Sequence, residues 1–338
     1  MTKNNSEYSR FHLVNEMNET VEYIKNLNHG SIQEFFGLPA EDLNLMLTGE
    51  GSSRIFPAKN SVHRRLSIER GPHIFTESST DLANKNLRDF IVIGASNSGR
   101  TKELVNLFGK LKDSGHEHLY GLTCKHNSLL AKYSKKTAIL DVGAEKAVAA
   151  TKSVIAQALF YDIMLLEWHK NEKTDTRELS VLFEQALNCR VENRIIDSLC
   201  KANMIYYAGN NNGVAEELTL KTNEIVRKKS GFLPGTYLLH GVEEVITSSD
   251  VIILVDPYPD EFEKIKSIYT NNIEATVVAF SSEATPFHTI KIPETTPFSD
   301  PYIKLAAGWN LLIESGIKLG IDLDKTERAR KIGNEAEN

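Results

Sequence analysis

The stretch Phe90-Ile-Val-Ile-Gly-Ala-Ser-Asn-Ser-Gly-Arg-Thr-Lys-Glu-Leu104 decides how this chain folds. An apolar run passes through a turn of small hydroxyl residues and glycine into an amphipathic pattern, which predicts a strand, a turn and a helix. Such a turn at a helix N-terminus presents backbone N–H groups, hydroxyl donors and the positive end of the helix dipole to one anion. We therefore predict a phosphate-binding turn at residues 96–101.

The spacing inside this turn favours a single phosphate group. No Gly-Lys-Ser/Thr closes it as in a P-loop, and no second and third glycine follow as in a dinucleotide-binding fingerprint. A monophosphate therefore fits better than ATP or NAD. The plainer alternative is a Ser/Gly turn that caps a helix and binds nothing.

Composition narrows the class of protein. The chain has 338 residues, of which 41% are hydrophobic and 25% charged, so it is long enough for two globular domains. A net charge of −6 argues against nucleic-acid binding, which needs clustered Lys and Arg. The chain shows neither an apolar run of about 20 residues nor a signal-peptide core, and its three cysteines lack metal-type spacing. We expect a cytoplasmic protein with buried free thiols and no membrane contact.

Strand and helix patterns alternate along the chain in two cycles, after a polar, helix-leaning segment at residues 8–36. Expected strands lie at residues 43–49, 90–95, 118–123, 137–142, 204–209, 251–255 and 275–280. Expected helices lie at residues 100–114, 127–135, 145–170, 213–229, 258–270 and 301–318. This alternation predicts an α/β fold of two units, each a parallel sheet with helices on both faces.

A polar, charged segment at residues 170–178 separates the two cycles and is typical of a linker. We accordingly expect an N-terminal helical segment at residues 1–40, a first subdomain at 41–172, a second at 173–325 and a C-terminal tail at 326–338.

Hydroxyl residues distinguish the first half of the chain from the second. They follow two expected strands of the first half, as Ser52 and Ser53 and again within residues 96–101. Two strand ends of a parallel sheet could thus face one phosphate. The matching loop of the second half, residues 209–213, has no hydroxyl group, so we expect one phosphate site. Arg100 and Lys102 are treated as solvated residues of the helix and not as part of that site.

The second half offers candidates for proton transfer. Lys221 comes three residues before Glu224 in an expected helix, so the two side chains can pair. His240 stands between Leu239 and Gly241. The plainer alternatives are a surface ion pair and a core or capping imidazole. No His, Asp or Glu cluster has the spacing of metal ligands, and we expect neither a metal nor a cofactor.

Together these motifs resemble the double sugar-isomerase (SIS) domain proteins, above all the isomerase half of glucosamine-6-phosphate synthase and its stand-alone relatives. The similarity spans residues 45–331 and rests on segments 52–53, 96–101, 145–152, 221–224 and 240–241, and on the Gly-x-Asp-x-Asp stretch at 320–324. It implies two flavodoxin-like subdomains and a homodimer whose subunits share the active site around a small-molecule sugar phosphate.

The resemblance also implies a role for individual residues. Five residues would hold the phosphate: Ser53, Ser96, Asn97, Ser98 and Thr101. Glu224 would move a proton between C1 and C2, with Lys221 polarising the substrate. His240, reaching in from the partner subunit, would open the sugar ring. Lys331 aligns with a lysine that forms a Schiff base with an open-chain ketose, although a lysine in a polar tail is often only solvated.

Departures from the family pattern leave the substrate open. No amidotransferase domain precedes the isomerase part, so ammonia would come free or from a partner protein. Val242 stands where the synthases usually have Pro, Ala150 where a small hydroxyl residue is common, and Thr326-Glu327 where the family has Pro-Arg. Three hypotheses follow: a phosphosugar aldose–ketose isomerase, a deglycase of phosphorylated fructosamines, and a catalytically silent sugar-phosphate sensor.

Overall fold

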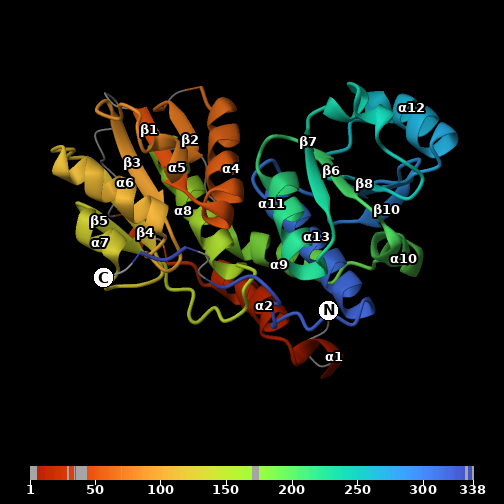
Figure 1. The fold of residues 1–338 in the computed structure, drawn as a ribbon, viewed down its shortest axis with the longest axis horizontal. Helices are drawn as coiled ribbons and strands as arrows, with labels where there is room; N and C mark the ends of the chain where they lie inside the picture. Colours follow the sequence, from red (N-terminus) through yellow and green to blue (C-terminus); the bar gives the residue numbers. More distant parts are fainter. Residues whose placement is uncertain are drawn as a thin grey trace. The chain divides into compact units, whose positions relative to one another are not determined.

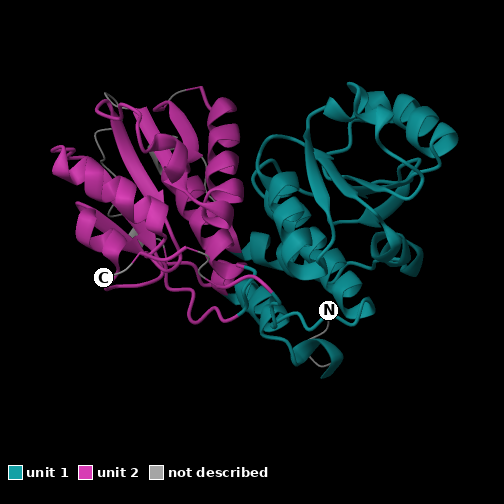
Figure 2. Ribbon diagram, viewed as in Figure 1, with its two compact units in different colours: residues 1–22, 147–149, 177–327 teal, residues 23–146, 150–176, 328–338 magenta. Residues whose placement is uncertain are grey.

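The computed structural model describes residues 6–28, 30–33, 35, 44–69, 71–169, 175–331 and 334–336, which form two compact units. Unit 1 comprises Met1–Glu22, Ala147–Ala149 and Arg177–Glu327, and unit 2 comprises Tyr23–Lys146, Ala150–Thr176 and Arg328–Asn338 (Figure 2). Both units are discontinuous in sequence. The expected boundaries at 40/41 and 172/173 lie outside the described residues.

Unit 2 is built on a five-stranded parallel sheet within the described residues, in the order β2-β1-β3-β4-β5 (Figure 1). The strands are β1 Asn44–Gly49, β2 Ile74–Ser78, β3 Phe90–Ala95, β4 Leu119–Thr123 and β5 Lys136–Ile139. The chain leaves β1 for β2 on one side and returns to β3 on the other. This reversal between β1 and β3 is where parallel α/β sheets bind ligands, at the carboxyl ends of the strands.

Helices cover both faces of this sheet because residues of its central strands are apolar on both sides. On one face α4 (Ile55–Leu66) and α8 (Lys152–His169) pack over Leu45, Leu47 and Ile93. On the other face α5 (Ser79–Leu82), α6 (Lys102–Asp113) and α7 (Leu129–Tyr133) pack over Met46 and Val92. The short helices α3 (Gly30–Gln33) and η1 (Gly51–Ser53) complete the described helices of this unit.

Unit 1 repeats the same topology. Its described sheet is also five-stranded and parallel, in the order β10-β9-β8-β6-β7 (Figure 1). The strands are β6 Ile205–Gly209, β7 Ser230–Pro234, β8 Val251–Leu254, β9 Thr276–Ser281 and β10 His288–Lys291. Counted from β6, this order is that of unit 2, so the reversal point of the second sheet lies between β6 and β8.

The helices of unit 1 again form two layers. One layer contains α9 (Thr176–Leu187), α10 (Asn193–Lys201), α11 (Val214–Lys221) and α13 (Asp300–Lys318). The other contains α12 (Phe262–Ile265), which continues as a π-helix at Lys266–Asn272. Short 3-10 helices lie at Tyr237–Leu239, Val242–Glu244 and Pro259–Glu261.

The N-terminal helices are α1 (Ser6–Ser9) and α2 (His12–Lys25). The carboxylate of Asp324 accepts hydrogen bonds from the first N–H groups of α2, at 2.7 Å from His12 N and 2.9 Å from Leu13 N. Because these groups have no partner inside the helix, the Asp324 side chain acts as its cap.

The structure confirms the α/β class, the two parallel sheets and the N-terminal helices, and corrects several elements. The strands β2, β7 and β10 were not expected; each is an edge strand with exposed positions. The helices α9 and α10 were also not expected, and α9 begins inside the supposed linker, of which residues 170–174 lie outside the described part. The helix expected from residue 145 begins only at Lys152.

The described residues contain no helix long and apolar enough to cross a membrane. Nor does any group of three or more His, Cys, Asp or Glu among them lie close enough together to hold a metal ion. The cysteines Cys124, Cys189 and Cys200 are free thiols but only partly buried, where full burial was expected.

Candidate active site

The hydroxyl turn, residues 96–101, connects β3 to α6 at the reversal point of unit 2. Ser96 is 2% exposed, and its Oγ lies 2.8 Å from Thr101 Oγ1 and accepts a hydrogen bond from Gly99 N at 3.0 Å. Gly99 has φ of 63°, and a Cβ there would collide with the side chain of Ser128. The turn is thus held tightly closed, with the hydroxyls of Ser96 and Thr101 side by side.

The neighbouring strand β1 ends beside this turn. Gly49 is its last residue, and a Cβ there would lie 2.7 Å from the carbonyl oxygen of Ala95 at the end of β3. The 3-10 helix that follows carries Ser53, whose Oγ lies 3.4 Å from Nε2 of the buried Gln157 in α8. Both hydroxyl-bearing segments therefore occupy the carboxyl edge of one sheet, as the sequence predicted from parallel strands.

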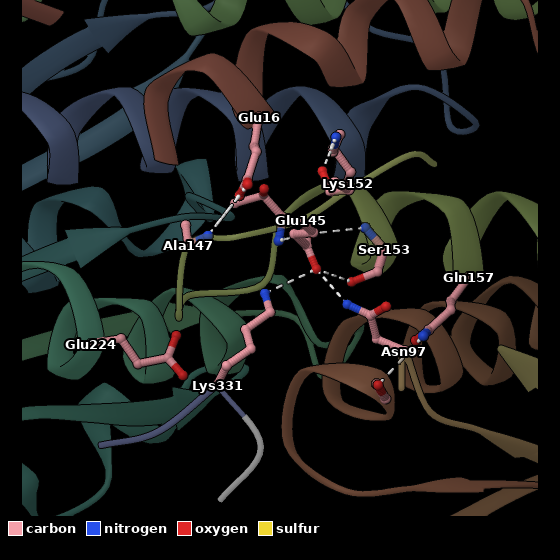
Figure 3. A network of polar contacts seen from close by, with 12 residues as sticks. Glu16, Asn97, Glu145, Ala147, Lys152, Ser153, Gln157, Glu224 and Lys331 are labelled. Atoms are coloured by element: carbon pink, nitrogen blue, oxygen red, sulfur yellow. Dashed lines mark hydrogen bonds and ion pairs between the residues drawn. The ribbon is translucent and has the colours of Figure 1, made fainter. Parts of the chain in front are cut away.

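Glu145 accepts several hydrogen bonds in this region, and its side chain is 2% exposed. Its Oε1 accepts from Thr151 N at 2.8 Å, and its Oε2 accepts from Ser153 Oγ at 2.9 Å and from Asn97 Nδ2 at 2.6 Å. The Lys331 ammonium lies 3.2 Å from the same Oε2 (Figure 3). A carboxylate that satisfies N–H groups at the start of α8 explains why residues 145–151 are not helical.

The charge of Glu145 follows from these contacts. Burial raises the pKa of Glu145, but the Lys331 ammonium and the hydrogen bonds from Thr151 and Ser153 outweigh it and hold this pKa below its usual value. Burial and the nearby Glu145 charge raise the pKa of the Cys124 thiol to about 12. At neutral pH the site therefore contains an ionised carboxylate beside a neutral thiol.

The C-terminal segment lies along the hydroxyl turn. Lys102 N donates to Asn334 O at 3.1 Å, Ala336 N donates to Arg100 O at 2.9 Å, and Arg100 forms an ion pair with Glu335. This backbone pairing places residues 334–336 against the N-terminus of α6. Arg100, which was expected to be only solvated, is instead paired with this segment through Glu335.

In unit 1 the predicted pair of Lys221 and Glu224 is formed. Lys221 Nζ lies 2.7 Å from Glu224 Oε2 and 3.4 Å from Glu217 Oε1. The side chains of Lys221 and Glu217 are fully buried, whereas that of Glu224 is 27% exposed. Glu224 lies in a π-helical turn, Thr222–Val226, which continues α11. One buried cation thus orients a carboxylate that reaches solvent, and π-turns of this kind are frequent at functional sites.

His240 lies elsewhere in unit 1, between the 3-10 helices Tyr237–Leu239 and Val242–Glu244. Its side chain is exposed, and its ring Nε2 lies 3.4 Å from Thr236 Oγ1. Among the described contacts within unit 1, the imidazole is therefore placed by its own loop and not by Lys221 or Glu224. Tyr237, which is 52% exposed, and Val245, which is 64% exposed, flank it.

The reversal point of the second sheet is filled by a side chain of the protein. Asp256, which follows β8, accepts a hydrogen bond from Asn210 N at 2.8 Å, and Lys304 Nζ lies 2.6 Å from its other oxygen. Lys304 also pairs with Asp300 at 2.7 Å. Burial lowers the pKa of Lys304, but the two carboxylates outweigh it and hold this pKa above its usual value. A carboxylate thus stands where the first sheet has its hydroxyl turn.

The structure brings most of the candidate residues into two groups. Within unit 2 the hydroxyl turn and Lys331 lie on either side of Glu145, and Ser53 lies at the adjacent strand end. Within unit 1 Lys221 and Glu224 are in contact, and His240 is on a separate loop. Sequence reasoning missed Glu145, although this residue opens the segment 145–152 that carried part of the family resemblance.

One departure from the family pattern has a structural counterpart. Glu327, which stands where the family has Arg, accepts from Arg227 Nη1 at 2.5 Å, and Arg227 Nη2 donates to the Lys325 carbonyl at 2.6 Å. Arg227 ends the π-turn with φ of 56°. These contacts attach residues 325–327 to Arg227, at the end of the π-helical turn that contains Glu224.

Known structures share this fold across nearly the whole chain. The C-terminal domain of glucosamine-fructose-6-phosphate aminotransferase from Francisella tularensis has a TM-score of 0.76 at 18% identity, covering 95% of this chain and 100% of that one. Tagatose-6-phosphate ketose/aldose isomerase from Escherichia coli has a TM-score of 0.74 at 16% identity, covering 96% of each chain. Glucosamine-6-phosphate deaminase from Thermotoga maritima has a TM-score of 0.73 at 17% identity, covering 96% of this chain and 99% of that one.

Sequence comparison adds a family assignment for unit 2. No curated protein sequence matches the chain. Residues 43–167, which contain β1 to β5 and most of α8, match the SIS domain. Residues 43–167 are therefore a SIS domain, and the chain adds a second five-stranded sheet of the same strand order.

Proposed function

We propose that this protein is a phosphosugar aldose–ketose isomerase that acts on a hexose or aminohexose 6-phosphate of the glucosamine-6-phosphate/fructose-6-phosphate type. The observation that carries the proposal is the hydroxyl turn at the reversal point of the SIS domain. The corresponding point of the second sheet is occupied by Asp256, which supports a single phosphate site. Structures with this fold include isomerases and a deaminase of hexose 6-phosphates, as their names state.

In the proposed complex, the phosphate binds to Ser53, Ser96, Asn97, Ser98 and Thr101. Hydroxyl and N–H donors at the start of α6 suit a phosphate, because the helix dipole adds to their attraction. The phosphate is remote from the reacting carbons, so its binding energy serves to position C1 and C2.

Glu224 is the proposed base. Aldose–ketose conversion removes a proton from the carbon next to a carbonyl or imine and returns it to the neighbouring carbon, and one carboxylate can do both. Lys221 supports this role because its buried ammonium, 2.7 Å from Glu224 Oε2, orients the carboxylate and can stabilise a developing oxyanion. The proposed proton transfer uses protein side chains alone.

His240 and Lys331 complete the proposed site. The exposed imidazole of His240 suits a group that opens the sugar ring in the site of a partner subunit, which requires a homodimer. The Lys331 side chain, after losing a proton from its ammonium, would condense with the open-chain ketose. An amination reaction would in addition need ammonia, either free or from a partner protein. The free thiols of Cys124, Cys189 and Cys200 are consistent with the reducing cytoplasm.

Three parallel incubations test the proposal: glucosamine 6-phosphate, fructose 6-phosphate with ammonia, and a phosphorylated fructosamine. In deuterated water we expect NMR to show exchange of the C2 proton of glucosamine 6-phosphate, and uptake of deuterium at C1 of fructose 6-phosphate in the presence of ammonia. Release of an amine or amino acid from the third alone would instead assign a deglycase.

Isothermal titration calorimetry with the same compounds provides the second readout. Binding of a sugar phosphate without exchange or release would assign a sensor and refute the isomerase. Failure to bind any phosphorylated compound would refute the phosphate site itself. The Ser114→Ala variant is a suitable control for protein quality, because Ser114 is an exposed residue at the far end of α6.

A further inference from the structure

We propose that Glu145 is a positioning residue that holds the nitrogen of Lys331 and serves as counter-ion to its positive charge, first as an ammonium and then as an iminium. The proposal rests on the proposed function, in which Lys331 condenses with an open-chain ketose. It assigns a role to a carboxylate that the phosphate site and the proton transfer do not use.

The geometry of Glu145 is independent of Lys331. Three hydrogen bonds from Asn97, Thr151 and Ser153, all between 2.6 and 2.9 Å, fix the two carboxylate oxygens within the protein (Figure 3). The Lys331 ammonium, whose side chain is 29% exposed, approaches Oε2 at 3.2 Å. A rigid, buried anion therefore receives the end of a longer and more exposed side chain, which is the arrangement expected of a positioning residue.

Among the described residues, Glu145 is an anion in direct contact with Lys331. Lys152 is buried, and its Nζ donates to the Ala144 carbonyl at 2.8 Å. The pKa of Cys124, raised to about 12 mainly by burial, keeps that thiol neutral in the working range, although Lys125, Lys331 and Lys152 each lower it. The pKa of Glu145 lies below its usual value despite burial, so Glu145 is ionised at neutral pH.

Imine formation at Lys331 explains what the Glu145 carboxylate would do. Lys331 first loses a proton, because only the neutral amine attacks the carbonyl, and a proton is taken up again as water leaves. The net reaction is R–NH3+ + O=C → R–NH+=C + H2O, so the C–O double bond is replaced by C–N and the oxygen leaves as water. The Lys331 nitrogen therefore carries one positive charge before the reaction and again after it. A fixed carboxylate at Oε2 stabilises that charge in both states and favours the protonated imine. A protonated imine acidifies the neighbouring C–H bond more strongly than a neutral one.

Asn97 connects this pair to the phosphate. Its side-chain amide donates to Glu145 Oε2. Its backbone carbonyl accepts from Cys124 N at 3.0 Å and from Thr123 Oγ1 at 3.0 Å. The hydroxyl turn and the counter-ion are therefore parts of one rigid network. A phosphate bound at the turn would therefore be held in a fixed position relative to the Lys331 nitrogen.

The first experiment needs no sugar. The reactivity of the Lys331 amine is measured by competitive acetylation and mass spectrometry in the unmodified protein, in Glu145→Gln and in the charge-preserving Glu145→Asp. We expect Glu145→Gln to raise the acetylation rate of Lys331 about tenfold, because the amine loses the carboxylate that holds it. Glu145→Asp should restore much of the difference. The exposed Asp141→Asn in the same unit is the matched control and should leave Lys331 unchanged. An unchanged acetylation rate of Lys331 in Glu145→Gln would overturn the proposal.

The second experiment traps the imine. Borohydride reduction in the presence of fructose 6-phosphate should attach the sugar to Lys331, and Glu145→Gln should reduce the yield about tenfold at pH 7. The yield of this variant should recover toward acid pH, where the imine is protonated without the carboxylate. Faster acetylation of Lys331 with an undiminished yield of adduct would overturn the counter-ion role. Absence of any adduct in the unmodified protein would contradict the role of Lys331 in the proposed function. In that case the sugar-free measurement still decides whether Glu145 holds Lys331.

Discussion

The ammonium of Lys221 and the carboxylate of Glu224 are 2.7 Å apart, and the lysine is fully buried whereas the glutamate reaches solvent. The i, i+3 spacing spans the junction of α11 and a π-turn, so the change of helix type sets where the carboxylate lies. Burying the Lys221 ammonium together with a second carboxylate, that of Glu217, costs folding free energy, because both charged groups lose their hydration. A role for Lys221 in the reaction would explain this arrangement.

Glu224→Gln should abolish turnover and keep the affinity for a sugar phosphate. The amide keeps the shape of the side chain but cannot accept the proton, so we expect kcat to fall by at least about a hundredfold. The rate is measured by NMR on reactions quenched at set times, and the affinity is measured by calorimetry. Glu283→Gln, an exposed residue of the same unit, is the control. Unchanged turnover would remove Glu224 from its proposed role.

Mixing two inactive variants should restore activity if subunits share the site. A dimer of one Glu224→Gln and one His240→Ala subunit would contain one intact pairing of Glu224 with His240. Random mixing should then recover about a quarter of the normal rate, because half the dimers are mixed and each has one active site. The mass of the assembly is checked by light scattering. A mixture as inactive as its components would show that each subunit uses its own His240.

Ser96→Ala should weaken phosphate binding without unfolding unit 2. The substitution removes the hydroxyl that lies 2.8 Å from Thr101 Oγ1 and accepts from Gly99 N. Loss of such contacts is worth about 1.4 kcal/mol, or about tenfold in Kd. Inorganic phosphate and a sugar phosphate are titrated in parallel. A larger loss of affinity in Ser114→Ala, the control at the other end of α6, would contradict the assignment of the turn.

Lys304→Met should strongly destabilise unit 1. Lys304 is 11% exposed and pairs with Asp256 at 2.6 Å and Asp300 at 2.7 Å, so its removal leaves the buried Asp256 carboxylate and the partly exposed Asp300 carboxylate without their cation. We expect a loss of about 3 kcal/mol in the free energy of unfolding by urea. Lys318→Met on the same helix breaks an exposed pair with Asp197 and should change stability little. Equal effects of the two substitutions would disprove the distinction.

The contribution of Glu145 to stability should depend on pH in a defined direction. Because the pKa of Glu145 is lower in the folded protein than its ordinary value of 4.5, its stabilising effect is complete above that value. The effect is lost as the pH falls through the folded pKa. The difference in unfolding free energy between the unmodified protein and Glu145→Gln should therefore shrink below about pH 4.5. A difference that grows on acidification would mean that burial, and not Lys331, dominates.

Sequence patterns predicted the interior of both sheets and failed at their edges. Strands such as β3 and β8 are continuous apolar runs because helices cover both faces. The edge strand β10 is His288-Thr-Ile-Lys291, in which only Ile290 is buried, so its composition does not differ from that of a loop. The π-helical turn after α11 was not predicted either, since its residues have the same local pattern as an α-helix.

Sequence spacing could place candidate residues only when they are close along the chain. The pair of Lys221 and Glu224 follows from helical geometry, but the burial that distinguishes it from a surface ion pair depends on the packing of α11. Glu145 and Lys331 are separated by 186 positions, and no periodicity connects them. Likewise, the position of Asp256 at the second reversal point depends on the strand order, which only the folded structure reveals.

The attachment of residues 334–336 to Arg100 and Lys102 bears on how unit 2 could be dissected. An excised fragment limited to residues 43–167 would lack this segment and also Lys331, although both belong to the same compact unit. The backbone groups at the start of α6 would then be open to an added peptide. A synthetic peptide covering residues 328–338 could be supplied in trans to such a fragment. Its dissociation constant would then measure how strongly this segment attaches to the rest of unit 2.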